Sequence, residues 1–323
     1  MVTAIRVHTV GGPEALVVEE VEVGLPGAGE VLVRHTAIGV NFIDTYFRSG
    51  LYKTQLPLTP GNEAAGVIEA VGEGVTGFKV GDRVVYMHSP GAYVQKRVVP
   101  AEKLVPLPDG ISDEVGAAVL LKGLTAQYLL RRTHRLEAGQ TILVHAAAGG
   151  VGLLLGQWAR HLGATVIGTA GSQAKASLAL ENGYDHIINY REDDFVTRVL
   201  EITEGRKVDV VYDSVGKDTF PASLDVIRPL GLFVTFGQSS GPIPPVDLSI
   251  LNAKGSLYVT RPSLFAYMSS REVLLAAAAE VFALIEQGVL KIAVNQRFAL
   301  TEAKAAHEAL ESRATTGATI LIP

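Results

Sequence analysis

The chain of 323 residues contains no cysteine. It can therefore form no disulfide, no thiolate metal site and no cysteine nucleophile. No apolar run approaches the roughly 20 residues that cross a bilayer. The first residues, MVTAIRVHTV, also lack the apolar core of a secretion signal. We therefore expect a cytoplasmic protein with no membrane partner.

The sequence also lacks an excess of positive charge. Its 33 acidic residues outnumber its 28 lysines and arginines, and the formal net charge is −5. The absence of a basic stripe disfavours a nucleic-acid partner. The 48% apolar and 19% charged residues are ordinary for a globular protein. The length suits two domains, and we see no repeat or low-complexity segment.

The stretch at residues 141–152, TILVHAAAGGVG, organises the chain. The spacing predicts a buried strand over 141–145, a tight turn of small residues, and a helix over 151–162. This is the opening of a dinucleotide-binding βαβ unit. Ala147 occupies the first slot, where the chain turns, and Gly149 lets the backbone approach a pyrophosphate. Gly152 lets the helix press on the strand, and the helix N-terminus faces the phosphates.

Strands and helices continue to alternate after this unit. Nearly continuous apolar strands separated by helices predict a parallel, doubly wound α/β sheet of the Rossmann type. The alternative is a doubly wound domain that binds no nucleotide. Strands are expected at 165–169, 186–190, 208–212, 231–236 and 255–260, and helices at 172–182, 194–203 and 217–230.

The first part of the chain has a different pattern, with short strands separated by Gly/Pro turns. We expect strands at 4–10, 16–23, 31–37, 64–71, 83–87 and 93–99. Such spacing favours a small barrel. A helix at 112–132 leads into the nucleotide domain. Beyond residue 260, helices at 271–287 and 301–311 and a strand at 319–322 are too little for a third domain. The predicted division is 1–124, 125–260, and a tail, 261–323, that returns to the first domain.

The coenzyme is indicated near the end of the second Rossmann strand. NAD enzymes usually carry an acid about 20 residues beyond the glycine turn. Here residues 169–175 read TAGSQAK, with no acid and one cation. The Ser172 hydroxyl and the Lys175 ammonium, beside Gly171, suit a 2′-phosphate. Lys175 taken alone is equally well read as a solvated helix residue, but together these features predict NADPH.

The order of barrel, Rossmann domain and returning tail resembles the medium-chain dehydrogenase/reductase superfamily. Gly139-Gln140, Ala147-Ala148, Gly149-Gly150, Gly152, Gln157 and Arg160 fall at the spacing of the quinone oxidoreductase signature. The blocks NFIDTY (41–46), GNEAAG (61–66), YDSVG (212–216) and ESRAT (311–315) extend the likeness over the whole chain. It resembles the zinc-independent, zeta-crystallin-like NADPH:quinone oxidoreductases. The resemblance implies a GroES-like β-barrel catalytic domain and NADPH-dependent reduction of a quinone.

The resemblance to this superfamily also raises the question of whether the protein binds zinc. Alcohol dehydrogenases of this superfamily hold a catalytic zinc through cysteine and histidine. Asn41 and Asn62 fall near two of those positions, and amide side chains are poor zinc ligands. None of the eight histidines forms a short ligand pair, and His145 lies within a predicted core strand. We expect no metal, and a quinone accepts hydride without one.

The resemblance also assigns site residues. Asn41, Asp44 and Tyr46 are the catalytic candidates near the nicotinamide. Tyr46 or Asp44 would orient or protonate the substrate, although water could also supply the proton. Tyr52 would line the pocket, and Arg48 is a solvated or structural charge. The predicted cofactor-binding residues are Asn41, Tyr46, Ala147, Gly149, Gly150, Val151, Gly152, Gly171, Ser172, Lys175, Tyr190, Ser214, Phe236, Gly237, Gln238 and Arg313.

Two other functions remain open at this point. An NADPH-dependent enone or alkenal double-bond reductase needs the same cofactor and cleft. A nucleotide-binding interaction protein that binds RNA with little catalysis is the alternative from another class, and the acidic net charge disfavours it.

The segment SLYVT (256–260) would give the sheet an apolar edge. Related proteins pair this edge in a homodimer, so we expect a homodimer here.

Overall fold

The computed structural model describes residues 1–323, which form two compact units. The first unit comprises Met1–Leu124, Ser270–Gly288 and Ile292–Pro323, and the second comprises Thr125–Ser269 and Val289–Lys291.

The second unit extends past residue 260, where the sequence-based division ended it. The ring of Tyr267 stacks on Tyr128 with centroids 4.6 Å apart, and Arg132 donates to the Tyr267 carbonyl at 2.7 Å. Gln157 Oε1 accepts from the backbone N–H of Lys291 at 2.7 Å. These contacts keep the short helix α7 (Leu264–Tyr267) and residues 289–291 with the second unit.

The second unit contains a six-stranded, wholly parallel sheet in the order β10-β9-β8-β11-β12-β13. This order confirms the predicted doubly wound sheet. Side chains such as Leu143, Ile167 and Phe233 are fully buried in it. The strands are β8 (Thr141–Val144), β9 (Thr165–Ala170), β10 (His186–Asn189), β11 (Val208–Asp213), β12 (Ile227–Thr235) and β13 (Tyr258–Thr260).

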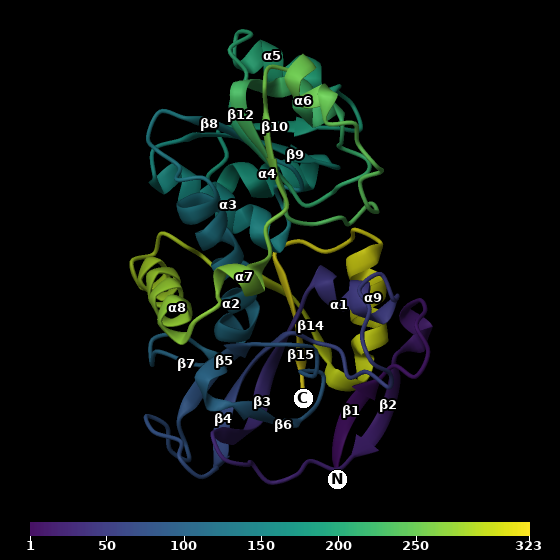
Figure 1. Cartoon of the computed structure of the whole chain (residues 1–323), viewed down its shortest axis with the longest axis vertical. Helices are drawn as coiled ribbons and strands as arrows, with labels where there is room; N and C mark the ends of the chain where they lie inside the picture. The colour runs from purple at the N-terminus through teal and green to yellow at the C-terminus, as the bar shows by residue number, and fades with distance from the viewer. The chain divides into compact units, whose positions relative to one another are not determined.

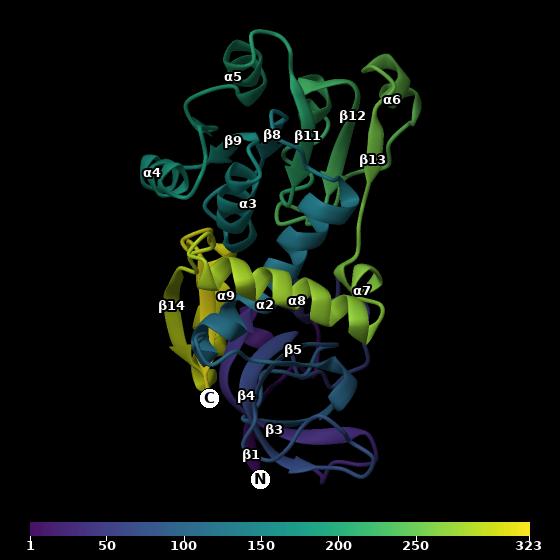
Figure 2. The same ribbon diagram turned by 90° about the vertical axis from the view of Figure 1, so that its left-hand side faces the viewer.

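Three helices of this unit lie where the sequence predicts them (Figures 1 and 2). They are α3 (Gly150–His161), α4 (Gln173–Glu181) and α5 (Phe195–Ile202); a short α6 (Ser249–Ala253) follows later. Side-chain caps fix two of the starts, because Ser172 Oγ accepts from Lys175 N–H and Asp194 Oδ2 from Thr197 N–H.

The predicted helix at 217–230 is wrong. The segment forms only a 3₁₀ turn, η4 (Ala222–Val226), and β12 begins at Ile227. Pro221 and Pro229 provide no backbone N–H for a helix. The residues just before the predicted helix form a loop, in which the Asp213 carboxylate accepts from the backbone N–H of Val215 at 2.6 Å.

The first unit is built on a mostly antiparallel seven-stranded sheet in the order β14-β15-β3-β4-β5-β7, with β6 paired to β3. The last strand, β15, lies between β14 and β3. The strands are β3 (Glu30–Val40), β4 (Glu63–Val71), β5 (Arg83–Met87), β6 (Lys96–Pro100), β7 (Leu104–Pro106), β14 (Val294–Ala299) and β15 (Ala318–Ile322). A separate hairpin pairs β1 (Val2–Arg6) with β2 (Val17–Val21).

The helices of the first unit come from distant parts of the sequence. A short helix, α1 (Phe42–Arg48), follows β3, and α9 (Ala303–Glu311) lies beside it (Figure 1). Helix α8 (Arg271–Glu286) also belongs here, and α2 (Asp113–Tyr128) crosses the boundary between the units before a π turn at Leu129–Thr133. The sequence did not predict α1 or β14. No helix in the chain has both the length and the apolar character needed to cross a membrane.

Candidate active site

The turn between β8 and α3 carries the glycine motif. Ala146 has a φ of 57°, and the Ala147 N–H donates to the Thr169 carbonyl at 3.0 Å, which ties the turn to β9. A Cβ on Gly152 would lie 2.4 Å from the Ala146 oxygen. Only glycine therefore lets α3 approach the turn this closely. The first turn of α3 contains no acidic residue, so its positive dipole end is not neutralised.

The end of β9 gathers donors for an anion. A Cβ on Gly171 would lie 2.4 Å from the Tyr190 hydroxyl, so this phenol lies directly against the glycine. Ser172 Oγ accepts from the Lys175 N–H at 3.4 Å and keeps its own hydroxyl proton to donate. Lys175 itself stands in the first turn of α4. A phenol, a hydroxyl and an ammonium at one helix start fit a phosphate ester.

Predicted residues also meet at the carboxyl ends of β11 and β12, where Rossmann folds bind ligands. A Cβ on Gly237 would lie 2.8 Å from the Ser214 carbonyl, so these two segments touch. Gln238 Oε1 accepts from Arg261 Nη2 at 2.9 Å. Sequence reasoning missed Arg261, which lines a cavity of about 250 Å³ together with Phe233.

In the first unit, Asn41 is held from two sides. Its backbone N–H donates to Asp44 Oδ2 at 2.8 Å, which caps the start of α1. Its side-chain amide donates to Glu63 Oε1 at 2.8 Å. Lys122 Nζ lies 3.0 Å from the same oxygen, and the Leu121 N–H donates to the other at 2.7 Å. Glu63, although within the GNEAAG block, and Lys122 were not predicted as site residues.

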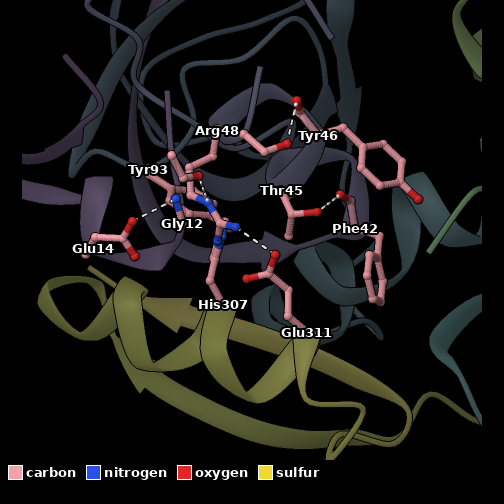
Figure 3. Close-up of polar contacts among 11 residues, drawn as sticks. Gly12, Glu14, Phe42, Thr45, Tyr46, Arg48, Tyr93, His307 and Glu311 are labelled. Carbon is pink, nitrogen blue, oxygen red and sulfur yellow. Dashed lines mark hydrogen bonds and ion pairs between the residues drawn. The ribbon is translucent and has the colours of Figure 1, made fainter. Parts of the chain in front are cut away.

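Helix α1 has two distinct faces. Tyr46 shares one face with Phe42, with ring centroids 6.4 Å apart, and packs edge-on against Tyr52 at 5.3 Å. In Figure 3 the Tyr46 ring points away from Arg48. Arg48 is only 2% exposed and pairs with Glu311 at 2.7 Å, so it is a structural charge and not a solvated one.

Burial changes the acidity of groups on the enclosed face. It raises the pKa of Asp44 to about 7, against the stabilising hydrogen bond from Asn41 N–H. Burial and the neighbouring Arg48 charge lower the pKa of His307 to about 3. Near neutral pH, Asp44 is therefore present in both its ionised and its protonated form, while His307 is neutral.

The side chains of Asn41 and Asn62 both donate hydrogen bonds. Asn41 donates to Glu63, and Asn62 Nδ2 donates to the His88 carbonyl at 2.9 Å. His145 is buried in the second unit, with Nδ1 3.0 Å from Thr169 Oγ1 and Nε2 2.9 Å from Ser223 Oγ. It is a hydrogen-bonded core residue, as expected.

Two family models match the chain. The alcohol dehydrogenase GroES-like domain matches residues 27–109, and the zinc-binding dehydrogenase model matches residues 150–279. Together with the two sheets, these matches define a medium-chain dehydrogenase/reductase with a GroES-like domain and a Rossmann domain.

Full-length relatives narrow the assignment. The chain is 55% identical to a quinone oxidoreductase of Pseudomonas aeruginosa and 53% identical to quinone oxidoreductase 1 of Escherichia coli, over 100% of each chain. The chain belongs to the quinone oxidoreductase family. A Burkholderia 2-haloacrylate reductase is 48% identical over 100% of this chain and 99% of its own. The crystal structure of Escherichia coli quinone oxidoreductase complexed with NADPH matches 99% of this chain and 100% of its own, with a TM-score of 0.98 and 52% identity.

Proposed function

We propose that this protein is an NADPH-dependent quinone reductase. The observation that carries the proposal is the end of β9, where the Tyr190 hydroxyl lies against Gly171, Ser172 caps α4 and Lys175 stands in its first turn, within a stretch (169–175) that contains no acidic residue. Such a set of donors favours a 2′-phosphate over a 2′-hydroxyl. A crystallised relative of 52% identity is complexed with NADPH. When bound, the nicotinamide supplies hydride, the chemistry that a quinone requires.

The residues that would hold the coenzyme fall into groups. Ala147 and Gly149 to Gly152 would face the pyrophosphate, at the start of α3. Arg313 would join the donors at the end of β9 to bind the 2′-phosphate. Residues at the carboxyl ends of β11 and β12 would contact the nicotinamide half. The full proposed set is Asn41, Tyr46, Ala147, Gly149, Gly150, Val151, Gly152, Gly171, Ser172, Lys175, Tyr190, Ser214, Phe236, Gly237, Gln238 and Arg313.

The first unit would orient the substrate. Asn41 is fixed by Asp44 and Glu63, so its position is set before substrate arrives. Asp44 is 0% exposed and would act through Asn41, without contact to the substrate. Tyr46 and Tyr52 present packed aromatic rings suited to a planar quinone. The reduced quinone oxygen would take its proton from the Tyr46 hydroxyl or from water.

We propose that the reaction needs no metal. The support is the chemistry of Asn41 and Asn62, whose side-chain amides donate hydrogen bonds to the Glu63 carboxylate and the His88 carbonyl. A neutral amide is a poor zinc ligand, and no group of three or more His, Cys, Asp or Glu side chains is placed to hold a metal ion. Activity that survives chelator treatment, in protein shown by elemental analysis to hold no stoichiometric zinc, is the expected result.

We further propose a cytoplasmic homodimer. The support is the edge strand β13, where Tyr258 is 63% and Val259 44% exposed in the single chain. An open apolar strand edge favours pairing with a second copy.

A second activity is favoured by one specific observation. The 2-haloacrylate reductase at 48% identity has a name that denotes reduction of an activated double bond. Steady-state oxidation of NADPH with a panel of quinones, enones and 2-haloacrylates tests both candidates. We expect the highest kcat/KM with quinones. Higher values with enones would make the double-bond reductase the main activity, and no turnover with any acceptor would favour a binding protein.

A further inference from the structure

A chain of hydrogen bonds runs through the interior of the first unit and ends at the start of α1. Arg48 Nη1 lies 2.9 Å from His307 Nδ1, and His307 Nε2 lies 3.0 Å from the Tyr93 hydroxyl. The Tyr93 hydroxyl lies 3.1 Å from Asp44 Oδ2, the oxygen that also accepts from the Asn41 N–H. We call Arg48, His307, Tyr93 and Asp44 the Asp44 relay.

The donors and acceptors of the relay have one consistent direction. A guanidinium can only donate, so His307 Nδ1 must accept and the ring proton of the neutral imidazole lies on Nε2. Nε2–H then donates to the Tyr93 oxygen. The Tyr93 hydroxyl proton is left to donate to Asp44. Arg48 thus determines, through His307 and Tyr93, that Asp44 receives a hydrogen bond.

The relay is enclosed and joins elements far apart in the sequence. Asp44, Tyr93 and His307 are each 0% exposed, and Arg48 is 2% exposed. His307 and Glu311, which pairs with Arg48, belong to α9. Figure 3 shows these two residues below α1 while Tyr46 points away from them. The relay therefore secures the enclosed face of the helix whose opposite face carries Tyr46.

We propose that Tyr93 and His307 are positioning residues of the reductase, which hold Asp44 as the acceptor of the Asn41 N–H and so keep Asn41 in its productive place. This inference rests on the proposed function, because the role of Asn41 near the nicotinamide belongs to that proposal. Neither residue is predicted to touch substrate or coenzyme. Their effect passes through Asp44.

The charges around Asp44 set the pH dependence that this role implies. Glu63 raises its pKa and Lys122 lowers it, while Asn41 N–H and Tyr93 O–H stabilise the ionised form. Arg48 and neutral His307 stand behind Tyr93. The ionised carboxylate is the stronger acceptor for Asn41. Loss of the Tyr93 hydroxyl therefore raises the pKa of Asp44 and weakens the hold on Asn41 near neutral pH.

The chain contains a matched control for this pair. Tyr86 OH lies 2.9 Å from His35 Nε2, and His35 Nδ1 lies 2.6 Å from the Val94 carbonyl. Both side chains are buried in the same unit. This tyrosine–histidine pair ends on a backbone carbonyl and not on α1. Removal of the Tyr86 hydroxyl should therefore lower the stability of the protein by a similar amount, without changing the contacts of Asn41.

The experiment compares Tyr93→Phe with Tyr86→Phe in the full chain. We expect Tyr93→Phe to raise the pKa of Asp44 by about one unit from about 7. The ionised fraction at pH 7 then falls from about one half to about one tenth, so kcat/KM for quinone reduction should fall about fivefold, with its acidic limb moved up by about one pH unit. Tyr86→Phe should keep the wild-type pH profile. Equal effects of both variants, or an unmoved limb in Tyr93→Phe, overturn the proposal.

A second pair keeps the test decisive if Tyr93→Phe does not fold. An amide both accepts and donates, so His307→Gln should retain most activity, whereas His307→Leu should lose it. Equal activity in the two overturns the relay. Hydrogen exchange of the Asn41 amide gives a readout apart from activity, and it should quicken in Tyr93→Phe and His307→Leu only. If wild type reduces no quinone, the proposed function fails, and unchanged exchange in these variants would then reject the relay separately.

Discussion

The ammonium of Lys122 lies 3.0 Å from the carboxylate of Glu63, and the two side chains are only 8% and 0% exposed. Glu63 also accepts from Asn41 and from the backbone N–H of Leu121. A buried charge with this many partners is tolerated only while each partner is present.

Removal of one partner should therefore destabilise the protein strongly. We expect Lys122→Met to lower the free energy of unfolding by about 3–5 kcal/mol, because Glu63 is left buried without its counter-charge. The control is Lys304→Met, whose pair with Glu308 is 55% exposed on both sides. It should change stability by less than about 1 kcal/mol. Urea denaturation measures both, and similar losses would contradict the assignment.

His307 should give stability a specific pH dependence. The pKa of this group is lowered to about 3 in the folded protein, against 6.5 ordinarily. Between these values the unfolded chain binds a proton that the folded protein does not, so the contribution of His307 to stability rises with pH. Asp44, with its pKa raised to about 7, has the opposite slope above about pH 4.

The variant His307→Gln removes the first slope and leaves the second. The stability advantage of wild type over the variant should shrink as the pH is lowered from 6.5 to 4, by up to about 1.4 kcal/mol per pH unit. Denaturation across this pH range measures the difference. His161→Gln, at the exposed end of α3, is the control. A difference that stays constant with pH would show that His307 is not held neutral.

Coenzyme choice should depend on Lys175 and Arg313. Each would supply a charge-assisted bond to the 2′-phosphate, about 1.5–3 kcal/mol. The double alanine variant should weaken NADPH binding by about two to four factors of ten and leave NADH nearly unchanged. Fluorescence titration with both coenzymes measures this, with Lys304→Ala as the control. Equal weakening of both coenzymes would show that these residues support the fold instead.

The backbone at Arg313 provides a separate test. This residue follows α9 with a φ of 59°, a conformation that suits glycine. Arg313→Gly should be more stable than Arg313→Ala by about 1 kcal/mol, because alanine keeps the left-handed strain. Both should lose NADPH affinity alike. Thermal unfolding with coenzyme titration separates the two effects, and a glycine variant that binds as well as wild type would remove Arg313 from the phosphate site.

The proposed dimer should depend on the β13 edge. Light scattering of the wild type at micromolar concentration should report a dimer. Tyr258→Asp should shift it toward monomer, because a buried carboxylate at a strand edge opposes pairing. Leu180→Glu, at another exposed apolar position, is the control and should remain dimeric. A monomeric wild type would exclude the assembly.

Residue pattern predicted the parallel sheet well, because strands buried on both faces are nearly continuous apolar runs. It missed β14, where exposed and half-buried residues alternate. It also missed α1, whose seven residues make fewer than two turns and are too few to show a repeating helical pattern. The place of Ser172 and Lys175 at the start of α4 was foreseeable, because the two residues lie only three positions apart in the sequence.

The enclosed polar groups were not foreseeable in the same way. Glu63, Tyr93 and His307 come from segments that meet only in the folded unit. One signal was present for His307, which shares the buried face of α9 with Ala303 and Ala306. A polar ring within an apolar helix face needs a partner. The sequence alone does not say which residue that partner is.

The place of β15 in its sheet has a consequence for synthesis on the ribosome. Strand β3 receives one of its neighbours only when residues 318–322 arrive, with Ile320 opposite Gly39. The sheet of the second unit is complete once Thr260 has emerged. The unit that begins first along the chain therefore closes last. Until then the end of β3 that pairs with β15, residues 38–40, presents an open strand edge in the nascent polypeptide, and such edges favour aggregation.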